Sequence, residues 1–103
     1  MNNLLNFLGI ARKAGKLALG YTATSLALKK GAVTIVILAT DLSPHTKEKI
    51  ERLCRKDQIR LYSVAKQEEL GRAVGKTSQA VIGVLSPEIA KAIENQLVQA
   101  RTE

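Results

Sequence analysis

The sequence has few of the residues that build covalent or metal sites. Cys54 is the single cysteine, so an internal disulfide is excluded, and no Cys or His pattern of metal-ligand spacing surrounds it. We therefore expect Cys54 to be a small core residue, and we expect no metal and no cofactor. His45 is the single histidine and falls in the first turn of an expected helix, which predicts a solvent-facing side chain.

Aromatic residues and long apolar runs are also scarce. Phe7, Tyr21 and Tyr62 make up 3% of the chain. Proteins that stack successive unpaired bases need an aromatic platform, so this composition argues against sequence-specific binding of a single strand. No apolar run is long enough to span a bilayer, and no signal peptide or lipidation motif is found. We expect a cytoplasmic protein with no membrane partner.

Acidic residues are absent before Asp41. The same segment, residues 1–40, contains five basic residues: Arg12, Lys13, Lys16, Lys29 and Lys30. The whole chain has a formal net charge of +7 and a pI of about 9.9, which favours polyanionic partners. A solvated surface that only aids solubility is the alternative. Because no acids alternate with these bases, we favour a phosphate-binding face within this acid-free segment.

Helix and strand signals alternate along the chain. Apolar spacing and end signals predict helices at 4–13, 22–30, 44–54, 67–74 and 87–98, and short β-branched or alternating runs predict strands at 16–19, 33–39, 59–64 and 80–85. We expect Asn2 or Asn3 to cap the first helix, and Thr22 or Thr24 to cap the second. Strand 16–19 should lie at an edge, and the apolar strand 33–39 should be central.

This alternation predicts an α/β fold, a three-layer α-β-α sandwich with a small mixed sheet of about four strands. The length and the lack of a linker or repeat predict a single domain over residues 1–103. Ser43-Pro44 and Ser86-Pro87 should each start a helix. The inward side of the last helix should consist of Ile89, Ala90, Ile93, Leu97 and Val98.

No set of side chains predicts catalysis. Asp41 follows the central strand, but neither a second carboxylate nor a nucleophile and base accompany it, so we expect it to cap a neighbouring loop. The segment from Gly71 to Thr77 ends in Gly-Lys-Thr like a phosphate loop. Its glycines are one residue too close and no helix is expected after it, so this interpretation is rejected. We expect no enzyme activity.

Several motifs together resemble a known family. Gly20, Gly31, the run VTIVILATDLSP from Val33 to Pro44, Leu53-Cys54 and the run ELGRAVGK from Glu69 to Lys76 follow one another in this order. In this order they resemble the ribosomal L-seven-Ae family of kink-turn RNA-binding proteins, over nearly the whole chain. The opening LLNFLGIARKAGKLALG is more similar to the bacterial YlxQ-type branch of that family than to its archaeal ribosomal members.

The resemblance implies a three-layer α-β-α fold without enzyme activity. It also implies a site where the N-terminus of the second helix and the loop after the fourth helix grip a sharply bent RNA. Carried over by position, the helix contact falls on Gly20, Thr22, Ala23 and Leu26, with Lys16, Lys29 and Lys30 nearby. The loop contact falls on Gly75, Lys76, Thr77 and Ser78.

The chain departs from the family pattern where kink-turn RNA is recognised. Family members usually have Asn-Glu where this chain has Thr22-Ala23, and a lysine where it has Leu26. We therefore expect a non-enzymatic, monomeric protein that recognises a folded RNA, a kink-turn or a feature of ribosomal RNA, by shape and backbone. The alternative is a protein-interaction scaffold of the same fold. Leu26 either faces the core or forms an exposed apolar patch with Tyr21, and only the exposed patch would favour a protein partner.

Overall fold

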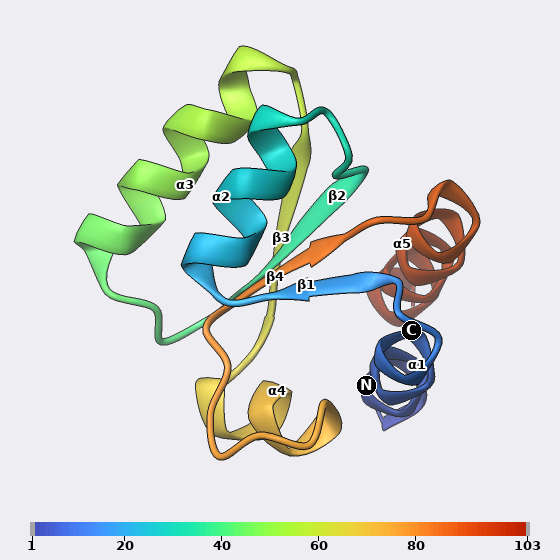
Figure 1. The fold of residues 1–103 in the computed structure, drawn as a ribbon. Coiled ribbons are helices and arrows are strands. Elements are labelled where there is room, and N and C mark those ends of the chain that lie inside the picture. The colour runs from blue at the N-terminus through green and yellow to red at the C-terminus, as the bar shows by residue number, and fades with distance from the viewer. Residues whose placement is uncertain (1, 103) are drawn as a thin grey trace.

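The expected alternation of helices and strands is present in the computed structural model (Figure 1). The structure describes residues 2–102, and Met1 and Glu103, the ends of the expected 1–103 domain, lie outside it. The elements are α1 Asn2–Lys13, β1 Leu17–Leu19, α2 Tyr21–Lys29, β2 Ile35–Ala39, α3 Pro44–Lys56, β3 Arg60–Ala65, α4 Gln67–Ala73, β4 Val81–Val84 and α5 Pro87–Thr102.

The four strands form one mixed sheet in the order β1-β4-β2-β3. β2 pairs parallel with β3 and antiparallel with β4, and β1 pairs antiparallel with β4. The expected edge position of β1 and the interior position of β2 are confirmed. Every residue of β2 is buried, because helices cover both of its faces.

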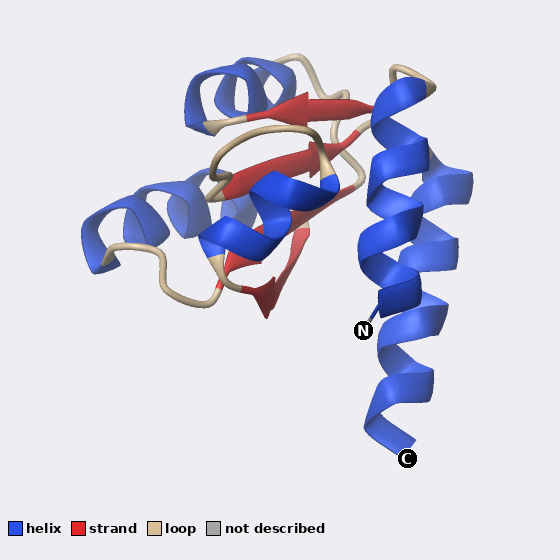
Figure 2. Ribbon diagram, turned by 90° about the horizontal axis from the view of Figure 1, so that it is seen from below, coloured by secondary structure: helices blue, strands red, loops and turns tan. Residues whose placement is uncertain are grey.

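α1, α4 and α5 cover one face of the sheet and α2 and α3 cover the other, which confirms the three-layer sandwich (Figures 1 and 2). Successive residues of β2 point to opposite sides. Ile35 and Ile37 join a core formed with α1, α4 and α5, whereas Val36 and Leu38 join a core formed with α2 and α3. In Figure 2, α1 and α5 lie side by side as an outer layer.

Several helix ends are those expected from local sequence. The Ser43 hydroxyl accepts a hydrogen bond from the Thr46 N–H (3.3 Å) at the start of α3, and Pro44 occupies the first helical position. Gly31 and Gly75 follow α2 and α4 with φ of 72° and 76°, a conformation that favours glycine at a helix C-terminus.

Two expected caps are wrong. The residue that caps α2 is Gly20, not Thr22 or Thr24. Thr24 is buried inside the helix, and its hydroxyl donates to the Ala18 carbonyl oxygen (3.3 Å). Asn3 already lies within α1, so it is not the cap of that helix, and the side chain of Asn2 lies outside those described.

The expected inward side of α5 is wrong at Val98. Ala90 and Ile93 are buried, but Val98 is 56% exposed. The helix has 16 residues, about 24 Å of length, and its C-terminal end runs past the sheet (Figure 2). Within residues 2–102, no helix is both long and apolar enough to cross a membrane.

Candidate nucleic-acid interface

The N-terminus of α2 is fixed to the sheet and lacks a side-chain cap. Gly20 has a φ of 95°, and its N–H donates to the carbonyl oxygen of Val81, the first residue of β4 (2.8 Å). The N–H groups of a first helical turn have no acceptor inside the helix, and Gly20 has no side chain that could accept from them. This end of α2 therefore attracts an anion.

The loop that joins α4 to β4, residues 75–79, lies directly on α4. A Cβ at Gly71 would be 2.5 Å from the Ser78 Cα, so only glycine lets the loop pass this close. The Lys76 N–H donates to the Gly71 carbonyl oxygen (2.7 Å), and the Gln79 N–H donates to the Gln67 carbonyl oxygen (2.9 Å). The loop backbone is thereby held in place, while the side chains of residues 76–78 remain exposed.

The structure brings this loop and the start of α2 together. The Val81 carbonyl oxygen accepts both from the Gly20 N–H (2.8 Å) and from Gln79 Nε2 (3.1 Å). A Cβ at Gly20 would lie 3.7 Å from Gln79 Nε2. Figure 1 shows the segment before β4 rising to the point where α2 begins. The expected helix contact and the expected loop contact are therefore neighbours on one surface.

The outer face of α2 is exposed beside this junction. Thr22 and Ala23 precede Leu26 by four and three residues, so both lie on the side of the helix that carries Leu26, and all three are exposed. Leu26 is 52% exposed, so the alternative that it faces the core is wrong. The helix instead presents Thr24 and Leu28 to the sheet, and α2 packs closest at Gly83, where a Cβ would lie 3.0 Å from Thr24 Cγ2.

Three of the expected basic residues are not close to this junction. Lys29 and Lys30 lie at the C-terminal end of α2, about 13 Å of helix from Gly20. Lys16 precedes β1 and is about 13 Å of extended chain from Gly20. The pKa of the Glu88 carboxyl, at the start of α5, is lowered. The carboxyl accepts hydrogen bonds from the Glu88 backbone N–H and from Ser86, and the positive charge of Lys16 lowers the pKa further. An RNA contact by these three lysines stays a prediction.

Two contacts made by or beside the 75–79 loop were not expected from the sequence. Gln79 contributes the side-chain hydrogen bond to Val81, and nothing in its neighbourhood signals that role. Arg12 Nη1 lies 3.4 Å from the position that a Cβ would take at Gly75. The signal for Arg12 was its place in the acid-free segment, at the last turn of α1.

The other candidate residues have the structural roles expected of them. Asp41 Oδ1 accepts from the Gln67 N–H (2.9 Å), which confirms that Asp41 caps the segment at the start of α4. His45 is exposed. Cys54 is buried, and this burial together with the charge of Glu51 raises the pKa of its thiol to about 11.

The sequence resemblance implied an α-β-α sandwich in which the N-terminus of the second helix and the loop after the fourth helix lie on one surface. The model of the ribosomal protein L7Ae/L30e/S12e/Gadd45 family matches residues 2–96. The chain therefore belongs to this family, and the resemblance is confirmed.

Individual relatives agree with this assignment. The RNA-binding protein YlxQ from Enterococcus faecium is 28% identical over 87 residues, which cover 84% of each chain. A solved structure of a Bacillus halodurans protein of unknown function is 36% identical, with a TM-score of 0.85 over 89% of this chain and 93% of that one. A 15.5 kD RNA-binding protein from Giardia lamblia shares the fold, at 16% identity and a TM-score of 0.78 over 96% and 85% of the two chains.

Proposed function

We propose that this protein binds structured RNA, without catalysing a reaction, on the surface where α2 begins and the 75–79 loop ends. The observation that carries the proposal is the shared Val81 carbonyl oxygen, which fixes Gly20 and Gln79 side by side. Both segments present backbone N–H groups or a lysine to solvent, and these groups suit phosphate and sugar oxygens. Family membership and the RNA-binding name of the YlxQ relative support the same function.

The RNA feature that this surface suits is a sharp bend. The start of α2 and the 75–79 loop are two separate segments that suit phosphate, and they lie on one surface. Such a surface suits an RNA in which two stretches of the phosphate backbone approach each other, as the strands of a kink-turn do. Thr22 and Ala23 have short side chains and Leu26 has no polar group, so they add little discrimination between bases. We infer recognition by shape and backbone of a kink-turn-like element, in ribosomal RNA or another folded RNA.

The three distant lysines extend this surface rather than form its centre. Lys29 and Lys30 are exposed at the far end of α2, and Lys16 is exposed before β1. Each would contact phosphates away from the bend and would add affinity without specificity. Their removal should weaken binding to bent and straight RNA by similar factors.

A salt titration with three RNAs tests the proposal. Wild-type protein should bind a kink-turn RNA more tightly than a straight duplex of equal length or a single strand. Lys76→Ala should weaken binding to the kink-turn RNA and make the plot of log K against log salt shallower by about 0.9, the value for one phosphate contact. Lys91→Ala removes an equally exposed lysine from α5 and is the matched control. Equal affinity of the wild type for all three RNAs would contradict the proposal.

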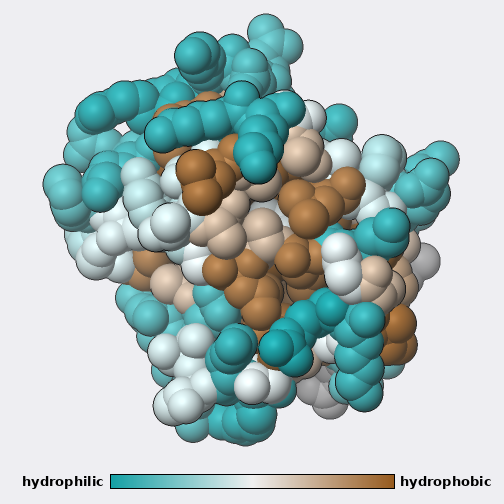
Figure 3. Space-filling model, in the orientation of Figure 1, coloured by the Kyte–Doolittle hydropathy of each residue, from teal (hydrophilic) through white to brown (hydrophobic). Residues whose placement is uncertain are grey.

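A protein-interaction scaffold is the second candidate. Leu26 is 52% exposed, and Figure 3 shows apolar surface gathered in the middle of the face of Figure 1 with hydrophilic side chains around it. The ring of Tyr21 is partly covered, because Lys49 Nζ lies 4.7 Å from its centroid. A protein that is retained on the immobilised chain after nuclease treatment, and that Leu26→Asp releases, would favour this function.

A further inference from the structure

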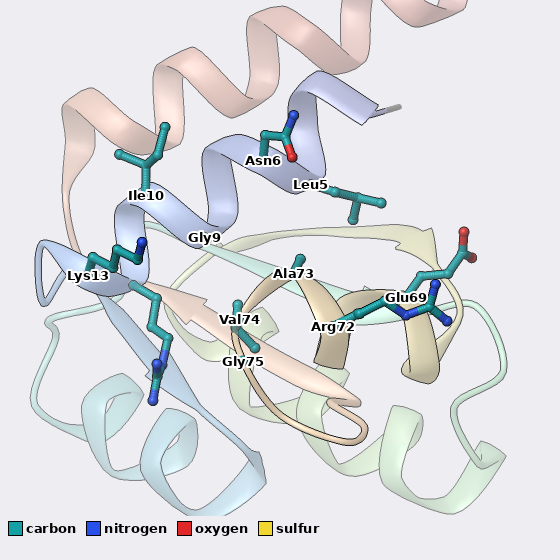
Figure 4. A pocket seen from close by; sticks show the side chains of 11 residues that line it. Leu5, Asn6, Gly9, Ile10, Lys13, Glu69, Arg72, Ala73, Val74 and Gly75 are labelled. Carbon is teal, nitrogen blue, oxygen red and sulfur yellow. The ribbon is translucent and has the colours of Figure 1, made fainter.

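A cleft of about 770 Å³ separates α1 from α4 (Figure 4). The two helices nearly touch at its floor, since a Cβ at Gly9 would lie 2.7 Å from the Ala73 carbonyl oxygen. Its lining includes Ile10, Arg12 and Lys13 on α1, and it ends at Gly75. The cleft therefore opens onto the 75–79 loop, at the edge of the surface to which the proposed function assigns RNA.

Positive charge collects at the end of the cleft nearest that loop. Arg12 and Lys13 occupy the last turn of α1, and neither forms an ion pair with any residue among those described. At the other end Arg72 pairs with Glu68 (2.8 Å), and the Glu69 carboxylate accepts from the Lys66 N–H (3.1 Å). Figure 4 shows Lys13 and Glu69 at opposite ends of the cleft. Because Glu68 and Glu69 lie away from Gly75, they do not neutralise Arg12 and Lys13, and the end of the cleft at Gly75 stays positively charged.

Arg12 joins this charged end to the proposed RNA surface. Its Nη1 lies 3.4 Å from the position that a Cβ would take at Gly75, so the guanidinium rests beside the loop backbone. A guanidinium can bind a phosphate through two parallel hydrogen bonds, and a neighbouring lysine adds a point charge. We infer that Arg12 and Lys13 bind the phosphodiester backbone of the stem that flanks the bent RNA element. This inference depends on the proposed function.

A simpler role for the pair is stabilisation of the helix end. Basic residues in the last turn of a helix interact favourably with its dipole. α3 provides the matched comparison, because it also ends with an adjacent basic pair, Arg55 and Lys56, both exposed, and it covers the opposite face of the sheet from α1 and α4. The same loss of two positive charges can therefore be made at either helix end.

The test compares Arg12→Gln/Lys13→Gln with Arg55→Gln/Lys56→Gln on two bent RNAs, one with short flanking stems and one with a long flanking stem. The α1 variant should lose affinity for the long-stem RNA only. If both phosphate contacts are lost, the wild-type advantage should shrink roughly tenfold between about 0.05 M and about 0.2 M salt. The α3 variant should bind both RNAs nearly as the wild type does.

Equal behaviour of the two double variants would overturn the inference while leaving the proposed function intact. Wild-type protein that does not prefer bent RNA to a straight duplex would reject the proposed function, and the inference with it. If the α1 double variant failed to fold, Arg12→Lys would replace it, because it keeps the charge at the helix end but loses the planar guanidinium. It should then show a smaller loss that is again confined to the long-stem RNA.

Discussion

A methyl group added at Gly71 would strike the backbone of the 75–79 loop. The Cβ of an alanine there would lie 2.5 Å from the Ser78 Cα and 2.6 Å from the Ser78 nitrogen. Carbon atoms in ordinary contact are about 3.5–4.0 Å apart, so the loop would have to move away by about 1 Å. Because the loop also positions Gln79 against Val81, Gly71→Ala should disturb the proposed RNA surface as well as the packing.

The stability change has two opposing parts. Overpacking of this kind costs about 1–3 kcal/mol, whereas alanine is favoured over glycine inside a helix by up to about 1 kcal/mol. We expect the free energy of unfolding to fall by roughly 1–2 kcal/mol, which lowers the Tm of a domain of this size by about 4–16 °C. Loss of one well-placed backbone contact to phosphate should also weaken RNA binding by roughly tenfold.

Thermal unfolding followed by circular dichroism, together with RNA binding at room temperature, separates these effects. Ile93→Val is the control, because Ile93 is buried on α5 and its shortening costs about 0.5–1.5 kcal/mol without touching the loop. At room temperature both variants should be folded, and only Gly71→Ala should bind the kink-turn RNA more weakly. If both variants bound RNA like the wild type, the position of the 75–79 loop would not matter for RNA binding, contrary to the proposed site.

Three further experiments test the packing and the helix caps of the fold. Thr24→Val should lower the free energy of unfolding by about 1 kcal/mol, because the Ala18 carbonyl oxygen loses its donor, and an unchanged midpoint in urea would contradict this. Ser43→Ala should cost about 1 kcal/mol through loss of the α3 cap, whereas Ser43→Asp should retain the stability of the wild type. Iodoacetamide should label Cys54 far more slowly in the native protein than in urea, and equal rates would show an accessible thiol. Because the folded state raises this pKa from 9.0 to about 11, the thiol's contribution to stability is complete below pH 9.0 and is lost as the pH rises toward about 11.

The elements that were predicted well are those with local signals. The apolar run of β2, the Ser43-Pro44 start of α3 and the glycine at 31 each depend on a few neighbouring residues. The strand order β1-β4-β2-β3 has no such signal, because β1 and β4 pair across most of the chain. The cap of α2 was mistaken for the same reason. Its threonines look like caps in the sequence, but the start of the helix is fixed by Val81 on a distant strand.

The candidate site was predictable in outline through the family resemblance. That resemblance directed attention to Gly20 and to the loop after α4, which the fold joins through Gln79 and the Val81 carbonyl oxygen. The acid-free segment suggested one continuous basic face. In the fold, the length of β1 separates Lys16 from Gly20, and the length of α2 separates Lys29 from Gly20. Proximity in sequence therefore overstated proximity in space. Arg12, by contrast, reaches the loop because α1 packs against α4, a contact that charge counting alone does not reveal.

Backbone amide chemical shifts, measured by NMR while a kink-turn RNA is added, would locate the RNA site on the protein. We expect the largest changes at residues 20–26 and 75–79, with smaller ones at Arg12 and Lys13, and a weaker, more diffuse pattern with a straight duplex. Changes centred on α3 or β3 would contradict an RNA site where α2 begins and the 75–79 loop ends, and the same pattern with both RNAs would contradict recognition of a bend.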